Sequence, residues 1–178
     1  ALICERGTEK TTLQAVGERA GYSRGLVSYR FGSKAGLFEF VVRSIGERWL
    51  ETLKRVTAGK AGLEALSAAT EAHRRFCLDD AEQVRAFYIL WFDSIGPGSV
   101  VREVIAGIHE RRQHDVTQWL MRGIEAGALP EGLDAGRIAR FFCVSVVGIV
   151  YQWLLAPDDD AALDAACADL MAAVGGLV

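Results

Sequence analysis

A short segment near the N-terminus contains the side chains best suited to chemistry with a partner. It presents guanidinium, hydroxyl and aromatic groups and no carboxylate: Ser23, Arg24, Gly25, Ser28, Tyr29 and Arg30. An arginine early in a helix can donate two hydrogen bonds to guanine O6 and N7, which discriminates between bases by about 1–3 kcal/mol. Thr12 and Lys34 stand at the expected starts of two neighbouring helices, where a hydroxyl, an ammonium group and free backbone amides suit a phosphate. The segment therefore predicts contact with DNA.

Two short helices joined by a tight turn must position these side chains. The spacing predicts helices over residues 11–20 and 23–30. Gly17 and Gly21 lie four residues apart, so that a small residue lets the helices cross closely while a glycine in the turn supplies positive φ. A small core can form between the helices from Val16, Ala20, Leu26, Val27 and Phe31. This pattern is typical of a helix-turn-helix, whose second helix enters the major groove; on spacing alone, an ordinary packed helix pair is the alternative.

The rest of the chain has helical periodicity and almost no strand pattern. The clearest breaks are Gly96-Pro97-Gly98 and the glycine-flanked stretch 127–132. We therefore expect an all-α fold of about nine helices, near residues 1–6, 11–20, 23–30, 34–56, 62–78, 81–94, 98–127, 134–155 and 159–175.

Charge is distributed unevenly over the 178 residues, whose net charge is −3. Residues 1–49 have a net charge of +3 and residues 50–178 a net charge of −6. This asymmetry indicates a basic DNA-binding domain over 1–49 and an acidic body over 50–178. Because Ala1 begins in what looks like the middle of an amphipathic helix, we expect the chain to continue upstream. The four cysteines are widely spaced and no signal peptide is visible, which predicts a cytoplasmic protein with reduced thiols.

Two stretches, TLQAVGERAGYSRG (12–25) and FGSKAGL (31–37), closely resemble the tetracycline-repressor (TetR) family of bacterial transcription regulators. The resemblance implies a homodimer in which helices 1–3 bind DNA, helix 4 links the domains, and the remaining helices bind a ligand and dimerise. By position, the family's DNA contacts fall on Thr12, Gln14, Ser23, Arg24, Gly25, Tyr29, Arg30 and Lys34. Ser28 stands where the family usually has tyrosine. Either the adjacent Tyr29 takes over that contact, or this chain docks on DNA differently.

The segment 62–127 is rich in aromatic residues interspersed with polar groups, a composition that suits a ligand cavity. The candidate ligand residues are His73, Phe76, Phe87, Tyr88, Trp91, Phe92, His109 and Trp119. The alternative for each aromatic residue is an ordinary core position.

The helix at 134–155 is apolar nearly all round, which predicts burial on one side in its own core and on the other against a partner. Together with the helix at 159–175 it would form a symmetric four-helix interface. The expected interface residues are Phe142, Val146, Ile149, Val150, Trp153, Leu163, Ala166 and Leu170. The rival interpretation is a membrane span over 138–156, but Arg140 and Gln152 lie inside that window. We therefore expect no membrane partner.

No residue pattern indicates an enzyme, a metal site or a cofactor. His109 and His114 are five residues apart, which does not align two ligands on one helical face. Neither a phosphate-binding loop nor a nucleophile elbow is present. The sequence thus predicts a transcriptional regulator, expected to be a repressor, that binds a near-palindromic double-stranded operator as a homodimer and is released by a small, largely apolar or aromatic inducer. The alternative is a helical ligand-binding or interaction module without sequence-specific DNA binding, which Ser28 favours.

Overall fold

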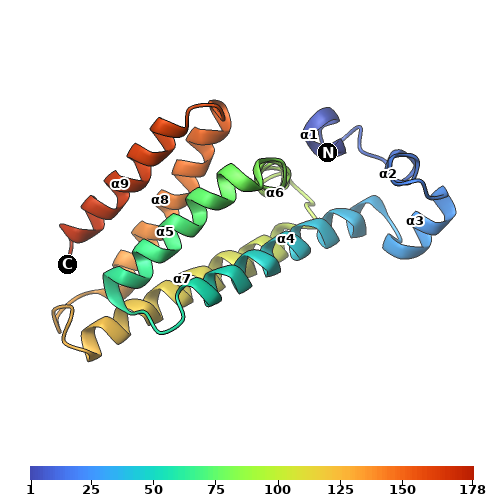
Figure 1. The fold of residues 1–178 in the computed structure, drawn as a ribbon. Helices are drawn as coiled ribbons and strands as arrows, with labels where there is room; N and C mark the ends of the chain where they lie inside the picture. Colours follow the sequence, from blue (N-terminus) through green and yellow to red (C-terminus); the bar gives the residue numbers. More distant parts are fainter. The chain divides into compact units, whose positions relative to one another are not determined.

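The computed structural model describes residues 1–178, and all of its regular structure is α-helical (Figure 1). Its nine helices are α1 (Leu2–Arg6), α2 (Leu13–Ala20), α3 (Arg24–Phe31), α4 (Lys34–Val56), α5 (Gly62–Asp79), α6 (Ala81–Asp93), α7 (Arg102–Glu125), α8 (Ala135–Leu155) and α9 (Asp160–Gly175). The predicted all-α fold is confirmed. The largest difference in helix bounds is at α7, which begins at Arg102 instead of 98.

Side-chain caps explain where the short helices begin. The Thr12 Oγ1 atom accepts a hydrogen bond from the Ala15 amide at 3.1 Å, and the Ser23 hydroxyl accepts one from the Leu26 amide at 3.2 Å. Each bond satisfies an amide that the first turn of a helix leaves without an intrahelical acceptor. The helix predicted over residues 11–20 begins at Leu13 with Thr12 as its cap, and the Thr11 side chain is buried.

Contacts divide the chain into two compact units. The first consists of Ala1–Arg48 and Glu82–Gly107, and the second of Trp49–Ala81 and Ile108–Val178. The functional boundary at residue 49 stays a prediction. The structure adds that residues 82–107, which the sequence analysis assigned to the body, pack with the N-terminal helices.

Within the first unit, α6 is tied to the N-terminal helices at both of its ends. The Thr8 hydroxyl donates a hydrogen bond to Asp93 at 2.5 Å, and the Cys4 thiol donates one to the Glu82 carbonyl at 3.4 Å. Gln83 accepts a further hydrogen bond from Arg48 of α4. These bonds join α6 to the segment that precedes α2 and to α4.

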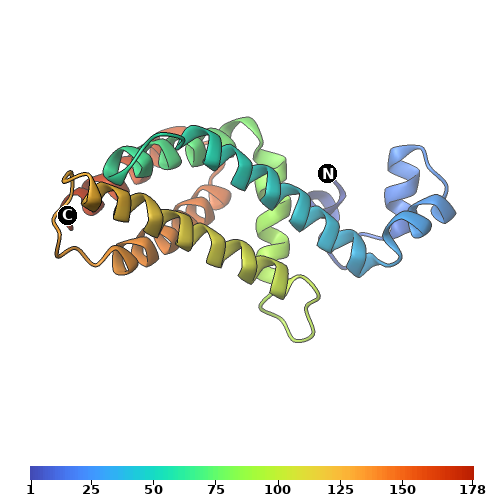
Figure 2. The same ribbon diagram turned by 90° about the horizontal axis from the view of Figure 1, so that it is seen from below.

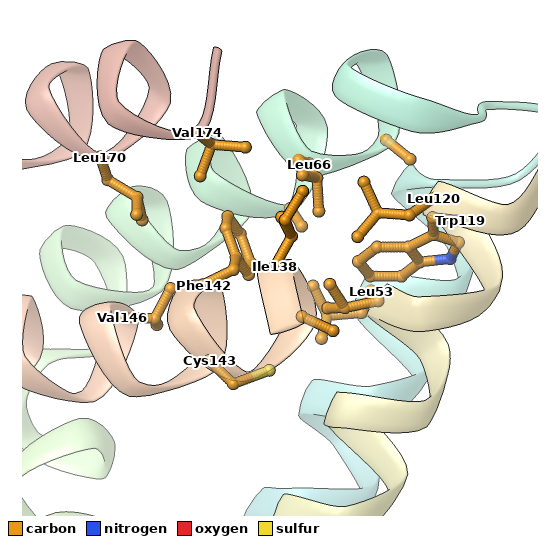
Figure 3. Close-up of a cluster of buried hydrophobic side chains, with 14 of the residues drawn as sticks. Leu53, Leu66, Trp119, Leu120, Ile138, Phe142, Cys143, Val146, Leu170 and Val174 are labelled. Carbon is orange, nitrogen blue, oxygen red and sulfur yellow. The ribbon is translucent and has the colours of Figure 1, made fainter. Parts of the chain in front are cut away.

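In the second unit α5, α8 and α9 lie side by side (Figures 1 and 2). Their apolar faces form a core with side chains of α4 and α7, and Figure 3 shows Phe142 of α8 in this cluster among Leu66, Ile138 and Val174. Phe142 is 2% exposed. Burying a side chain of this size stabilises the fold by about 1.5–3 kcal/mol, so α8 is a central element of this core.

Helix α8 is long and apolar enough, by length and composition alone, to cross a membrane. The core helix of a soluble protein passes the same test, and one such helix is weak evidence for a span. One face of α8, including Ile138, Phe142 and Val146, is buried within its own unit. The apolar composition of that face is therefore accounted for by the core.

Candidate nucleic-acid interface

Helices α2 and α3 pack closely because of two glycines. A Cβ atom at Gly17 would lie 2.8 Å from the Tyr22 carbonyl oxygen and 3.3 Å from Val27 Cγ2, so that only glycine fits without a shift of the backbone. Gly21 ends α2 in the left-handed conformation, at φ 73° and ψ 23°, which a residue with a Cβ atom adopts only at an energetic cost. The amide of Tyr22 donates a hydrogen bond to the Gly17 carbonyl at 2.8 Å. This geometry is that of a helix-turn-helix.

The outer surface of α3, with its cap, forms what we call the recognition face. Its members are Ser23, Arg24, Gly25, Ser28, Tyr29 and Arg30. All of them are exposed except Ser28, which is half-buried, and Tyr29 is 90% exposed. The Arg30 guanidinium lies 6.0 Å from the ring centroid of Phe31 and 5.8 Å from that of Phe40, within cation–π range. The face thus offers donors and an aromatic ring to a partner, and no carboxylate.

The two capping hydroxyls lie at the N-termini of α2 and α3. Because Thr12 and Ser23 accept amide hydrogen bonds through their oxygens, the hydroxyl hydrogen of each side chain can still be donated. A phosphate oxygen at a helix N-terminus accepts such a hydrogen and also meets the positive end of the helix dipole. Both side chains are therefore suited to hold a DNA backbone.

Two other predicted contact residues have partners within the protein. The Lys34 ammonium donates a hydrogen bond to the Glu9 carbonyl at 2.7 Å, and the Gln14 amide donates one to the Glu18 carboxylate at 2.9 Å. Lys34 is half-buried, and its Nζ atom lies 5.7 Å from the Phe38 ring centroid. Contact between either side chain and a phosphate requires it to exchange or share these bonds.

The predicted ligand residues fall into two groups, one in each unit. The first unit contains the aromatic run of α6, namely Phe87, Tyr88, Trp91 and Phe92. Within this run Tyr88 and Trp91 are stacked, with ring centroids 5.8 Å apart and an interplanar angle of 16°. An apolar groove of about 320 Å³ in the same unit involves none of the eight predicted residues; it is lined by residues that include Leu2, Ile3, Leu37, Ile45 and Ala86.

The second group lies in the second unit and consists of His73, Phe76, His109 and Trp119. Trp119 belongs to the apolar core, whereas His73 and Phe76 contact an aromatic residue that the sequence analysis did not name. Trp49 of α4 stacks on Phe76 at 4.9 Å and meets the His73 ring edge-on at 4.2 Å. The family resemblance implies a linking role for the helix at 34–56, which gives no reason to predict Trp49 as a site residue.

Most of the predicted dimer residues face inward in the single chain, and their place in an interface stays a prediction. Phe142, Val146, Val150, Trp153, Leu163 and Leu170 are buried within the single chain, and Ile149 and Ala166 are half-buried. The exposed hydrophobic residues of α8, together with Gly148, form a different stripe at alternating three- and four-residue spacing: Phe141, Val144, Gly148, Tyr151 and Leu155. An all-apolar helix gives no hydropathy difference between its two faces, so the sequence pattern did not separate the core face from the exposed one.

Comparison with known proteins gives matches to bacterial transcriptional regulators. The family model described as bacterial regulatory proteins, tetR family, matches residues 1–41, which include α2 and α3. The transcriptional regulator TtgR of Pseudomonas putida is 27% identical over 164 residues, which cover 86% of this chain and 75% of TtgR. BetI of Burkholderia ambifaria is 32% identical over 114 residues, which cover 63% of this chain and 58% of BetI.

Among solved structures, the complex of SmeT with triclosan superposes with a TM-score of 0.75 at 22% identity. The match covers 94% of this chain and 85% of SmeT. Both units of the chain therefore have a counterpart in the SmeT fold.

Proposed function

Because the chain belongs to the tetR family of bacterial regulatory proteins, we propose that it represses transcription as a homodimer bound to a near-palindromic operator. The chain is a ligand-responsive, DNA-binding transcriptional regulator. In the proposed mechanism a small molecule binds the body and lowers the affinity for the operator. Thermodynamic linkage requires that operator and small molecule weaken each other's binding by the same factor.

The recognition face of α3 is the observation that supports this proposal most strongly. Tyr29 is 90% exposed in a helix that otherwise packs on α2, and Arg24 lies at the exposed first turn. Because both side chains are exposed, packing in the domain core does not explain why these residue types are present. In the major groove, Arg24 would donate to a guanine edge, and Tyr29 would contact the phosphate backbone in place of a tyrosine at Ser28.

The exposed stripe on α8 supports the homodimer. Val144 is 64% exposed and Leu155 is 69% exposed, although both are apolar. With Phe141 and Tyr151 they repeat at the spacing by which two helices pack along a seam, and Gly148 between them allows close approach. A dimer would hold two α3 helices about 34–36 Å apart, one turn of DNA, which is what a near-palindromic site requires.

The body supplies the proposed ligand site. SmeT has been solved with triclosan, and the second unit here contains the cluster of Trp49, His73 and Phe76. Aromatic side chains with a few polar groups suit a small, largely apolar ligand. We propose no catalytic activity, in keeping with relatives that are transcriptional regulators. Action on chromosomal DNA places the proposed function in the cytoplasm.

Selection of bound duplexes from a pool with a randomised centre tests the proposal. We expect one near-palindromic sequence to be enriched, with half-sites about one helical turn apart. Addition of candidate small molecules to the selected complex then identifies an inducer by release of the DNA. A folded dimer that enriches no sequence at low salt would contradict the proposal and favour a ligand-binding module without specific DNA binding.

A further inference from the structure

Arg112 of α7 is the one buried cation of this chain. It is 5% exposed, whereas all the other lysine and arginine residues are half-buried or exposed. An isolated charge inside a protein loses its hydration, so that buried guanidinium groups normally pair with a carboxylate. Arg112 belongs to none of the ion pairs in the structure.

The protein gives Arg112 a neutral partner instead. Its Nη2 atom lies 3.2 Å from Nε2 of His73, and Nδ1 of His73 lies 3.0 Å from the Ala69 carbonyl oxygen. A ring nitrogen facing a carbonyl oxygen is protonated, and the other nitrogen is then the acceptor for the guanidinium. Burial and, second, the charge of Arg112 lower the pKa of His73 well below its ordinary value of 6.5, so the imidazole is neutral and does not compensate the cation.

Asp115, one turn further along α7, does not neutralise Arg112 either. Burial raises the pKa of its carboxyl group, and the carboxyl group forms no ion pair with Arg112. Arg112 therefore remains a buried positive charge without a counterion.

The surroundings of Arg112 are apolar and aromatic. The His73 ring is in edge contact with Trp49, which in turn stacks on Phe76. On the α8 side, the charge of Arg112 acts on the Cys143 thiol. The Arg112 guanidinium thus contacts His73 of α5 and lies near Cys143 of α8, and the His73 ring that it contacts packs against Trp49.

We propose that Arg112 binds the carboxylate of the small-molecule effector, whose apolar or aromatic body packs against Trp49 and Phe76. This inference rests on the proposed ligand response of the chain and narrows the ligand to an anion. A guanidinium presents five N–H donors, and the bond to His73 uses one of them. A carboxylate accepts two parallel hydrogen bonds from such a group and supplies the missing counter-charge.

Because Arg112 is buried, ligand binding there also requires a conformational change. With Arg112 5% exposed, an incoming carboxylate reaches it only when the helices around it move apart. A ligand that binds the rearranged state better than the closed state shifts the population toward that state.

Matched pairs of uncharged and anionic probes test the assignment by calorimetry on the protein alone. The probes are 2-naphthoate, 4-phenylbutyrate and octanoate, each compared with its primary amide. We expect at least one carboxylate to bind about tenfold or more tightly than its amide, because a hydrogen-bonded charge pair replaces a neutral contact. Arg112→Gln should abolish that preference, so that each carboxylate and its amide bind the variant with similar affinity. Arg111→Gln, the same substitution at an exposed neighbour, should retain it.

Three results would overturn the assignment: no carboxylate binds the folded protein, amides bind as well as carboxylates, or Arg112→Gln keeps the preference. If Arg112→Gln does not fold, the carboxylate-against-amide comparison on the unaltered protein still decides, through the rise in unfolding temperature that each probe produces. The result of this carboxylate test does not depend on the result of the duplex selection. Carboxylate binding without an enriched duplex would refute the proposed repressor and leave the anion site intact.

Discussion

Replacing Gly17 with alanine tests the close packing of α2 on α3. The new methyl group would lie 2.8 Å from the Tyr22 carbonyl oxygen and 3.3 Å from Val27 Cγ2. The first contact is with backbone in the turn that ends α2, so it cannot be relieved by rotation of a side chain. The turn, and with it the start of α3, has to move.

Two opposing effects determine how much Gly17→Ala changes the free energy of unfolding. Alanine stabilises a helix interior by about 0.5–1 kcal/mol relative to glycine. Forcing an extra carbon into a packed contact is destabilising by about 1–3 kcal/mol. Because the contact here is with backbone, we expect the second effect to dominate and the free energy of unfolding to fall by about 1–2 kcal/mol.

Gly107→Ala is the matched control. Gly107 lies within α7, and a Cβ atom there meets nothing within 4 Å, so only the helix-propensity gain remains. We expect this variant to be more stable than the parent by about 0.5–1 kcal/mol.

Urea denaturation with hydrogen exchange measured over residues 13–31 distinguishes the two variants. Gly17→Ala should increase exchange in α2 and α3 and weaken binding to the selected duplex, whereas Gly107→Ala should do neither. If Gly17→Ala gained stability as Gly107→Ala does, the packing of the helix-turn-helix described above would be refuted.

Three further substitutions follow from the same structure. Lys34→Gln should weaken binding to all duplexes alike and reduce the slope of log K against log salt concentration by about one. Lys54→Gln, at an exposed lysine, is the control. An unchanged slope in Lys34→Gln would show that Lys34 does not contact a phosphate. His73 stays neutral in the folded protein because burial and the charge of Arg112 lower its pKa. Below pH 6.5 the imidazole therefore binds a proton in the unfolded chain and not in the folded one. The free energy of unfolding should then decrease by up to about 1.4 kcal/mol for each pH unit. In urea titrations, His73→Gln should make the free energy of unfolding depend less on pH, and His114→Gln, at an exposed position, should not. The same pH dependence in both variants would contradict a buried, neutral His73. Val144→Glu should convert the proposed dimer to a monomer, as measured by sedimentation velocity. Val100→Glu, also at an exposed valine, should remain dimeric. If Val144→Glu were still a dimer, the exposed stripe of α8 would not be the interface.

The helix bounds were largely predictable because glycine, proline and capping hydroxyls mark them. Asp134, the first residue of the helix predicted over 134–155, caps α8 and accepts a hydrogen bond from the Arg137 amide at 2.9 Å. The helix predicted over 159–175 begins at Asp160, and Asp159 is the residue whose side chain caps it. Three consecutive aspartates offer the same chemistry, so the sequence alone does not choose among them.

The features that were not predictable depend on tertiary packing. Arg112 looks like a surface charge in sequence, and only the meeting of α5, α7 and α8 buries it. The stripe of Val144 and Leu155 could not be separated from the core face of α8, because both faces are apolar. The candidate DNA contacts were predictable because Gly17 and Gly21 mark the close crossing of α2 and α3 and the turn between them.

The most direct test of DNA recognition by α3 is base-by-base binding of Arg24→Ala to the selected operator. If Arg24 reads a guanine, the variant should lose about 5- to 150-fold in discrimination at one position of each half-site and keep its preferences elsewhere. Measurement on all single-base variants of the site, at one fixed salt concentration, gives this profile. A profile identical to that of the unaltered protein would contradict the assignment of α3 as the recognition helix.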